Sequence, residues 1–181
     1  MSRVEVNTDS NSDTDSNNKN RLLEEMEEAF YRKDVEYFKA LLKHDDFDIR
    51  ARAVCILVEI AEGEEAVEPI SDVLLNDPNA LVRHEAAFSL GQMGYASAVD
   101  ALIHAMLNDE SQFVRHEAAI ALGVIGSEHA REALMKALKD ESREVRESAE
   151  IALINLDYLA YSRQSKSNNS SSNKFARLTG G

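Results

Sequence analysis

A sequence pattern recurs four times along the chain at nearly constant spacing. The dipeptides "IR", "VR", "VR" and "VR" end at Arg50, Arg83, Arg115 and Arg146, which are 33, 32 and 31 residues apart. Each copy contains two segments of helical periodicity joined by a polar turn, such as "AVDALIHAML" followed by "FVRHEAAIALGVIG". One such unit cannot bury its apolar faces alone, so neighbouring units must stack. The pattern therefore predicts a solenoid of about four helix pairs.

The turn residues favour helices over strands. Asp77, Asp109 and Asp140 stand in the turns, where we expect each to cap the following helix. Gly94 and Gly126 follow apolar segments at positions typical of the left-handed residue that ends a helix. With seven Gly and two Pro, the chain has little turn chemistry for a many-stranded sheet, so we predict an all-α fold.

The repeat length suits more than one repeat class. Ankyrin and tetratricopeptide units have a similar period, but the chain contains no "TPLH" and no Trp. The pattern D-x-x-x-VR-x-x-A-x-x-A-L-G instead resembles short HEAT-like repeats. We therefore predict an α-α superhelix of HEAT-like helix pairs, preceded by one extra helix around residues 22–31.

Two polar segments flank the repeats. Residues 7–20, "NTDSNSDTDSNNKN", and residues 162–174, "SRQSKSNNSSSNK", contain no apolar side chain. Such segments cannot bury enough surface to offset the entropy of ordering. We expect disordered tails at residues 1–20 and 162–181, and a HEAT-like repeat domain at residues 21–161.

Composition limits the partners and the compartment. The net charge of −13 argues against nucleic-acid binding, which needs clustered Lys and Arg, although it would favour encounter with a basic partner. No apolar stretch approaches the roughly 18 residues of a membrane helix, and "MSRVEVNTDSNSD" lacks the apolar core of a signal peptide. A single cysteine, Cys55, fits a reducing compartment. We predict a cytoplasmic protein that binds neither nucleic acid nor membrane.

A His-Glu pair recurs in register in the two central repeats. The pairs are His84-Glu85 in "VRHEAAFSLG" and His116-Glu117 in "VRHEAAIALG". The outer repeats carry Ala-Arg and Glu-Ser at the same positions. Because nothing in helix formation requires a His-Glu pair, its presence in two adjacent repeats indicates a site.

The helical period places each His away from the core. At about 100° per residue, Val82, Ala86 and Leu90 share one face, and His84 lies roughly opposite it. Phe88 lies one turn after His84 on the same side, as Ile120 does after the second His. The face that bears the histidines therefore also carries apolar side chains that should avoid water.

Histidine and carboxylate together suit iron, zinc or manganese. Adjacent helix axes lie about 8–10 Å apart, so His84 and His116 could both reach one ion. Two His plus one carboxylate with open positions is the pattern of non-haem Fe(II) oxygenases. No second His follows at i+4, so these helices do not carry the HExxH motif of zinc proteases.

The order of the repeats resembles one half of the deoxyhypusine hydroxylase family. An unpaired repeat is followed by "LVRHEAAFSLGQMG", "FVRHEAAIALGVIG" and an unpaired "VRESAEIALINLDY", and the similarity runs roughly from Val35 to Tyr158. Members of this family are HEAT-repeat di-iron monooxygenases of hypusine biosynthesis, oxidoreductases that hydroxylate deoxyhypusine on a translation initiation factor. They carry two such halves in one chain, with four His-Glu pairs around two irons.

This resemblance implies a role for each paired residue. His84 and His116 would bind one iron, and Glu85 would reach across to the iron held by the other half. Glu117 would lie beside the metals as the catalytic residue that positions the substrate amine, and carboxylates are suitable partners for a cationic alkylamine.

Two further consequences concern space and assembly. Gly91 and Gly123 would leave room for oxygen or the substrate chain, since an interior helical Gly costs roughly 1 kcal/mol relative to Ala and so indicates a close approach. Because this chain has one half, a two-fold homodimer would have to complete the di-iron centre.

Two other functions fit the repeats. The first is a non-catalytic HEAT-repeat adaptor or scaffold, which would bind no stoichiometric metal. The second, a variant of the first, resembles the HEAT-like phycobilin lyases, although no residue here marks a tetrapyrrole site.

Overall fold

The computed structural model describes the backbone of residues 10–179 and the side chains of residues 19–165. Over these residues the chain forms α-helices and two short 3₁₀ turns, with no strand. The helices are α1 Ser10–Tyr31, α2 Val35–Leu41, α3 Phe47–Ile60, α4 Val67–Asn76, α5 Ala80–Met93, α6 Val99–Asn108, α7 Gln112–Ile125, α8 Arg131–Ala137 and α9 Arg143–Thr179. The predicted α-α superhelix of four helix pairs with an N-terminal helix is therefore confirmed.

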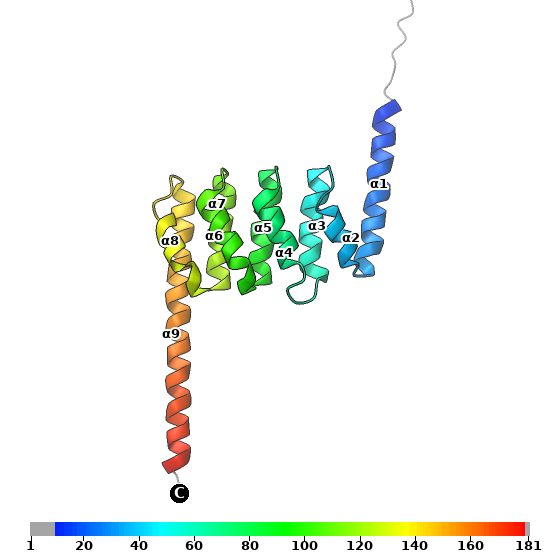
Figure 1. Ribbon diagram of the computed structural model, residues 1–181. Coiled ribbons are helices and arrows are strands. Elements are labelled where there is room, and N and C mark those ends of the chain that lie inside the picture. Colours follow the sequence, from blue (N-terminus) through cyan, green and yellow to red (C-terminus); the bar gives the residue numbers. More distant parts are fainter. Residues whose placement is uncertain (1–9, 180–181) are drawn as a thin grey trace, which may run out of the picture.

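The helix pairs stack in a single row. Figure 1 shows α3, α5, α7 and α9, the second helices of the four pairs, side by side in chain order, and each packs on the next. The first helices α4, α6 and α8 make a second, looser layer. Helix α1 packs at the N-terminal end, where Met26 is buried and Leu23 and Phe30 contact the core.

The core follows the predicted helical faces. Val82, Ala86 and Leu90 of α5 are completely buried, and so are the equivalent residues of α7. Burial of one Leu or Val side chain contributes roughly 1.5–3 kcal/mol, so this repeated face accounts for much of the stacking energy. The small alanines in it let successive second helices approach closely.

The two interior glycines lie where neighbouring helices are closest. A Cβ atom on Gly91 would stand 2.9 Å from the Cβ of Ala121, and one on Gly123 would stand 2.9 Å from the Cβ of Ala152. The next helix, α7 or α9, thus approaches each glycine closely. A role for these glycines in admitting oxygen or substrate stays a prediction.

A ladder of arginine–aspartate pairs joins the repeats, and it corrects the expected role of the aspartates. Arg83 Nε and Nη2 donate to both Asp109 oxygens at 2.8 and 2.9 Å, and Asp109 Oδ1 accepts from the Ser111 backbone N–H at 2.8 Å. Residues Asn79 and Ser111, not the aspartates, are the N-caps of α5 and α7. Each aspartate instead folds the turn and holds the arginine of the preceding repeat, an arrangement repeated by the pairs Arg50–Asp77 and Arg115–Asp140.

The first and last helices continue into the segments where tails are expected. Residues 10–20 begin α1, and residues 162–179 continue α9, which extends past the body of the solenoid in Figure 1. Low hydrophobicity predicts that a segment is not buried, but it does not prevent the backbone from continuing a helix that has already started. Residues 1–9 and 180–181 of the expected tails lie outside the described residues, and the domain boundaries remain a prediction.

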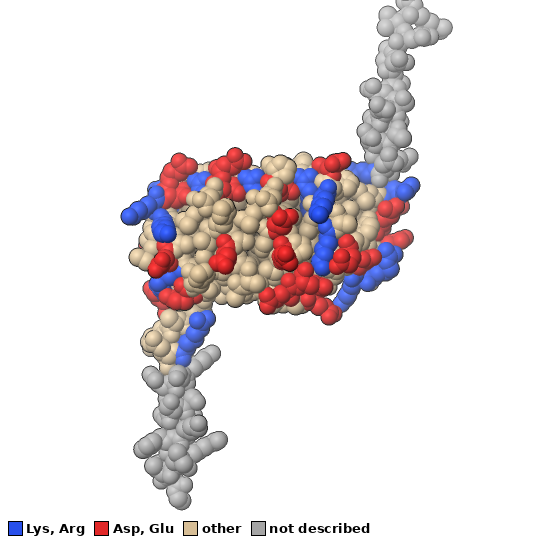
Figure 2. Space-filling view, in the orientation of Figure 1, with Lys and Arg blue, Asp and Glu red and all other residues tan. Residues whose placement is uncertain are grey.

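Charge is unevenly distributed over the surface. Figure 2 shows acidic and basic side chains along the two long edges of the array, and separate acidic and basic groups between uncharged areas in the middle of the visible face. Among the described residues, none of the helices is long and apolar enough to cross a membrane.

Candidate metal site

The first His-Glu pair lies on the exposed side of α5, as predicted. The His84 side chain is one-third exposed, and its Nε2 atom lies 3.5 Å from Glu117 Oε2 on α7. Its Nδ1 atom is buried and makes no hydrogen bond with any described residue; the nearest carboxylate oxygen, Glu85 Oε1, is 3.8 Å away. Buried ring nitrogens normally have a partner, so this atom has the capacity to bind a further group.

In the second pair, the carboxylate of Glu117 is buried. Glu117 is 9% exposed, and its Oε2 lies 3.5 Å from Nε2 of the His84 ring. A buried carboxylate is costly unless a positive charge or several hydrogen bonds compensate it. Glu117 therefore lies where a protonated histidine, an ammonium group or a metal ion would be stabilising.

The second histidine turns toward the last repeat. His116 Nδ1 lies 2.7 Å from the Ser148 hydroxyl and 3.4 Å from the Glu144 carbonyl oxygen, both on α9. Ser148 occupies in the fourth repeat the position of Glu117 in the third. His84 and His116 thus contact equivalent positions in the next repeat. Because His116 contacts Ser148 through Nδ1, its Nε2 atom is available to bind a ligand.

Glu85 points the other way, toward the first repeat. Cys55 Sγ on α3 donates to Glu85 Oε2 at 3.5 Å, a weak bond from a thiol. Partial burial, reinforced by the Glu85 carboxylate, raises the pKa of Cys55 to about 11, so the thiol is neutral at physiological pH. Glu85 thus has a thiol as its hydrogen-bond donor and the His84 ring 3.8 Å from its other oxygen.

The described side chains do not complete a metal site within one chain. His84, Glu85 and Glu117 lie together, but no group of three or more His, Cys, Asp or Glu among the described residues is arranged to hold an ion. The chemistry of the donors, imidazole and carboxylate, fits iron. An ion bound here would need further ligands in addition to these described side chains.

Apolar side chains surround the two pairs, as the helical wheel predicts. Phe88 is 44% exposed, and Ile151 is 67% exposed on α9 at the equivalent position. Phe113 and Leu81, at the starts of α7 and α5, are also exposed. Large apolar groups gathered around a polar cluster are typical of a surface that another molecule covers.

Two residues of this region were not assigned a role from the sequence. Ser148 and Cys55 contact His116 and Glu85, and aligning the outer repeats with the central ones gives their register but not these contacts. Ser148 is the register equivalent of Glu117, and Cys55 that of Phe88.

Known proteins share this architecture. A family profile described as HEAT repeats matches residues 67–154. The solved structure of human deoxyhypusine hydroxylase in complex with glycerol is similar to this chain, with a TM-score of 0.64 and 36% sequence identity. The alignment covers 70% of this chain and 44% of that one, so the chain spans less than half the length of the enzyme. A comparison with curated protein sequences gave no match. The chain is therefore similar, over 70% of its length, to somewhat less than half of human deoxyhypusine hydroxylase.

Proposed function

We propose that the protein is a di-iron monooxygenase of the deoxyhypusine hydroxylase type whose metal centre is completed by a second copy of the chain. The observation that carries the proposal is the cluster of His84, Glu85 and buried Glu117, in which one imidazole nitrogen has no partner. The 36% identity to human deoxyhypusine hydroxylase supports the choice of iron and of a hydroxylation reaction.

Each residue of the two His-Glu pairs has its own proposed role. His84 and His116 hold one iron, Glu85 binds the iron of the other copy, and Glu117 holds the ammonium group of the substrate. Bound iron would supply the activation of dioxygen. In the net reaction one oxygen atom enters a C–H bond of the substrate and the other leaves as water, with two electrons and two protons from an external reductant.

The substrate follows from the carboxylates and from the relative. Glu117 is enclosed by the helices on either side of it, and a primary ammonium group would compensate its charge better than a neutral group would. Deoxyhypusine, a lysine derivative with an aminobutyl extension, is such a cation. We propose this side chain, on a translation initiation factor, as the substrate.

The incomplete ligand set and the exposed apolar side chains around it support a homodimer. Two-fold symmetry would bring the apolar side chains of the two copies together and provide four His-Glu pairs. Covering Phe88, Ile120 and Ile151 would also remove from water side chains that are between 38% and 67% exposed in the single chain. Sedimentation equilibrium tests this directly, with an expected mass of twice the 20.2 kDa of one chain.

The decisive experiment is the iron content of protein expressed with iron supplied. We expect about one iron per chain, under the two-histidine, one-carboxylate pattern. His84→Ala and His116→Ala should lose the iron, whereas His104→Ala, a control on the exposed side of α6, should keep it. Mass spectrometry of the substrate protein should then show the gain of one oxygen atom.

A folded protein without iron above background would overturn the proposal. A HEAT-repeat binding module would then be the remaining function, and His84→Ala would be expected to have no effect on metal content. A strictly monomeric protein that still bound iron would refute the symmetric completion of the site.

A further inference from the structure

Ser148 places a buried hydroxyl group against the ring of His116. Ser148 is 6% exposed, and its Oγ atom lies 2.7 Å from His116 Nδ1 across the interface of α7 and α9. It occupies in the fourth repeat the position of Glu117 in the third, so a hydroxyl stands where His84 meets a carboxylate. At this distance the two groups are hydrogen bonded, and the direction of the bond decides which ring nitrogen of His116 carries the hydrogen.

The backbone of α9 favours one direction of this hydrogen bond. A hydroxyl can donate or accept, so Ser148 alone is compatible with either tautomer of His116. The carbonyl oxygen of Glu144 lies 3.4 Å from the same Nδ1 atom, and a carbonyl oxygen can only accept. Both contacts are satisfied together only when Nδ1 carries the hydrogen. Nε2 then has the lone pair that a metal ligand needs.

Helix α9 is held against α7 close to this contact. One turn after Ser148, Ala152 packs on Gly123, where an added Cβ would lie 2.9 Å from the Cβ of Ala152. Two turns after Ser148, Asn155 Nδ2 donates to the Gly123 carbonyl oxygen at 2.6 Å. Two packed helices therefore present the hydroxyl to the ring, and such a support orients a side chain more precisely than a loop does.

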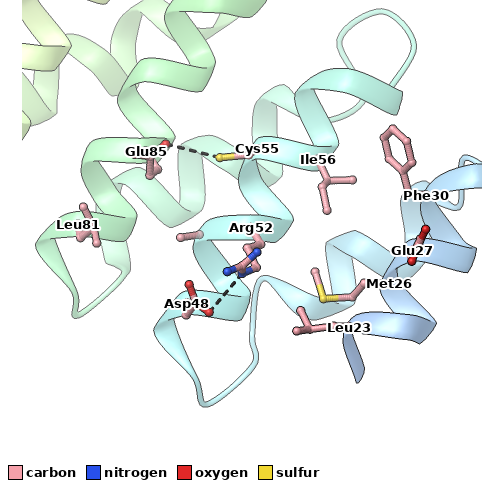
Figure 3. Close-up of a pocket in the computed structure, with 11 residues that line it drawn as sticks. Leu23, Met26, Glu27, Phe30, Asp48, Arg52, Cys55, Ile56, Leu81 and Glu85 are labelled. Atoms are coloured by element: carbon pink, nitrogen blue, oxygen red, sulfur yellow. Dashed lines mark hydrogen bonds and ion pairs between the residues drawn. The ribbon is translucent and has the colours of Figure 1, made fainter. Parts of the chain in front are cut away.

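The other junctions between repeats provide an internal comparison. The atom of His84 that faces the next repeat is Nε2, 3.5 Å from Glu117 Oε2, whereas its Nδ1 has no hydrogen-bond partner among the described residues. A neutral His84 should therefore carry its hydrogen on Nε2, the opposite of His116. Between the first two repeats the contact involves no histidine, because Glu85 meets the Cys55 thiol there, as Figure 3 shows.

We propose that Ser148 is a positioning residue, which holds the hydrogen of His116 on Nδ1 and so presents Nε2 as the ligating nitrogen. Without the hydroxyl only the Glu144 carbonyl would remain, and a contact of 3.4 Å is too long to fix the hydrogen by itself. This inference rests on the proposed function and deepens it. A repeat that has no His-Glu pair of its own thereby orients a ligand of the metal site.

The first test observes the ring hydrogens in the metal-free, full-length protein. Long-range proton–nitrogen NMR of protein labelled with ¹⁵N-histidine distinguishes a ring nitrogen that bears hydrogen from one that has a lone pair. At pH 9, well above the pKa of about 6.5 of free histidine, we expect hydrogen on Nδ1 of His116 and on Nε2 of His84. Ser148→Ala should give a mixture of both tautomers at His116, and Ser148→Thr, which keeps a hydroxyl, should restore the wild-type form. The signals are assigned by their loss in His84→Asn and His116→Asn.

The second test measures the affinity for Fe(II) without oxygen, by competition with a coloured chelator. Loss of the group that orients a histidine ligand typically lowers metal affinity about 10–100-fold. We expect a loss of about 10-fold for Ser148→Ala, because the Glu144 carbonyl remains, and nearly wild-type affinity for Ser148→Thr. Ser89→Ala is the matched control. Ser89 is 1% exposed on the core side of α5, and α7 carries Ala121 at the equivalent position, so this change should affect neither measurement.

The two tests separate this inference from the proposed function. Hydrogen on Nε2 of His116 in the wild type, or an unchanged tautomer in Ser148→Ala, would overturn the inference. Equal affinity of the wild type and Ser148→Ala for Fe(II), in a protein that binds iron, would also overturn it. The expected tautomers in a protein that binds no iron would refute the proposed function and still support the control of the His116 ring by Ser148.

Discussion

Replacing Asp109 with alanine should strongly destabilise the protein, because it leaves a buried guanidinium without its partner. The side chains of Arg83 and Asp109 are each 7% exposed and are joined by two hydrogen bonds of 2.8 and 2.9 Å. After the substitution, the Asp77 carbonyl oxygen and the exposed Glu110 carboxylate would be the remaining acceptors for Arg83. The Ser111 N–H would also lose its acceptor at the start of α7.

The magnitude follows from the burial. Removing one partner of a buried ion pair costs about 3–5 kcal/mol, and Glu110 lies within 3.3 Å of Arg83 to provide partial compensation. We therefore expect a loss near the lower end, about 3 kcal/mol, against a total stability of about 5–15 kcal/mol. Arg143→Ala breaks a pair whose side chains are 76% and 52% exposed, and this control should cost less than about 0.5 kcal/mol.

Urea unfolding followed by circular dichroism measures both variants, with the free energy of unfolding extrapolated to water. The double variant Arg83→Met with Asp109→Ala removes the stranded charge and should recover part of the loss. If Asp109→Ala costs no more than Arg143→Ala, the ladder is not a stabilising device and the argument from burial is wrong.

Three further predictions concern the glycine contacts and the titrating groups. Gly123→Val should cost about 1–3 kcal/mol of unfolding free energy, because its Cβ would stand 2.9 Å from the Cβ of Ala152 and force α7 and α9 apart. Urea unfolding measures this loss, with Val124→Ile as the control variant. Because burial and Glu85 raise the pKa of Cys55 to about 11, its neutral thiol stabilises the fold fully below the unfolded pKa near 9. That stability is lost as pH rises toward 11. In Cys55→Ala, the free energy of unfolding should therefore depend less on pH in this range. Ultraviolet titration of the thiolate in the wild type should give the same pKa, about 11. Burial opposes ionisation of Asp140, but the Arg115 guanidinium outweighs it and lowers the Asp140 pKa. Stability from this pair is therefore complete above the unfolded pKa of about 3.9 and is lost as pH falls below it. In Asp140→Asn, the free energy of unfolding should therefore fall less steeply with decreasing pH than in the wild type, which acid unfolding of both proteins would measure.

The sequence predicted the direction of side chains correctly where that direction depends on spacing within one helix. The helical wheel placed Val82 and Leu90 in the core and His84 outside it, because the direction of a side chain on a helix depends on its position within the 3.6-residue turn. The same reasoning identified Gly94 and Gly126 as left-handed C-caps, which have φ values of 72° and 66°.

Sequence reasoning was less successful where the outcome depends on a neighbouring repeat. The aspartates were expected to cap helices, but a bidentate arginine from the preceding repeat holds Asp109 three residues before the first residue of α7. The contact between Ser148 and His116 was likewise not foreseen, because it joins two helices that are separate in sequence.

What the sequence alone determined is the repeat, the helical faces and the position of the two His-Glu pairs, since each depends on spacing within one helix or on the constant length of the units. The tertiary structure decided what each of those residues touches. It turned His84 toward Glu117, His116 toward Ser148 and Glu85 toward Cys55. These contacts join residues about 30 positions apart, and for the two histidine contacts the distance depends on how closely Gly91 and Gly123 allow α5, α7 and α9 to approach.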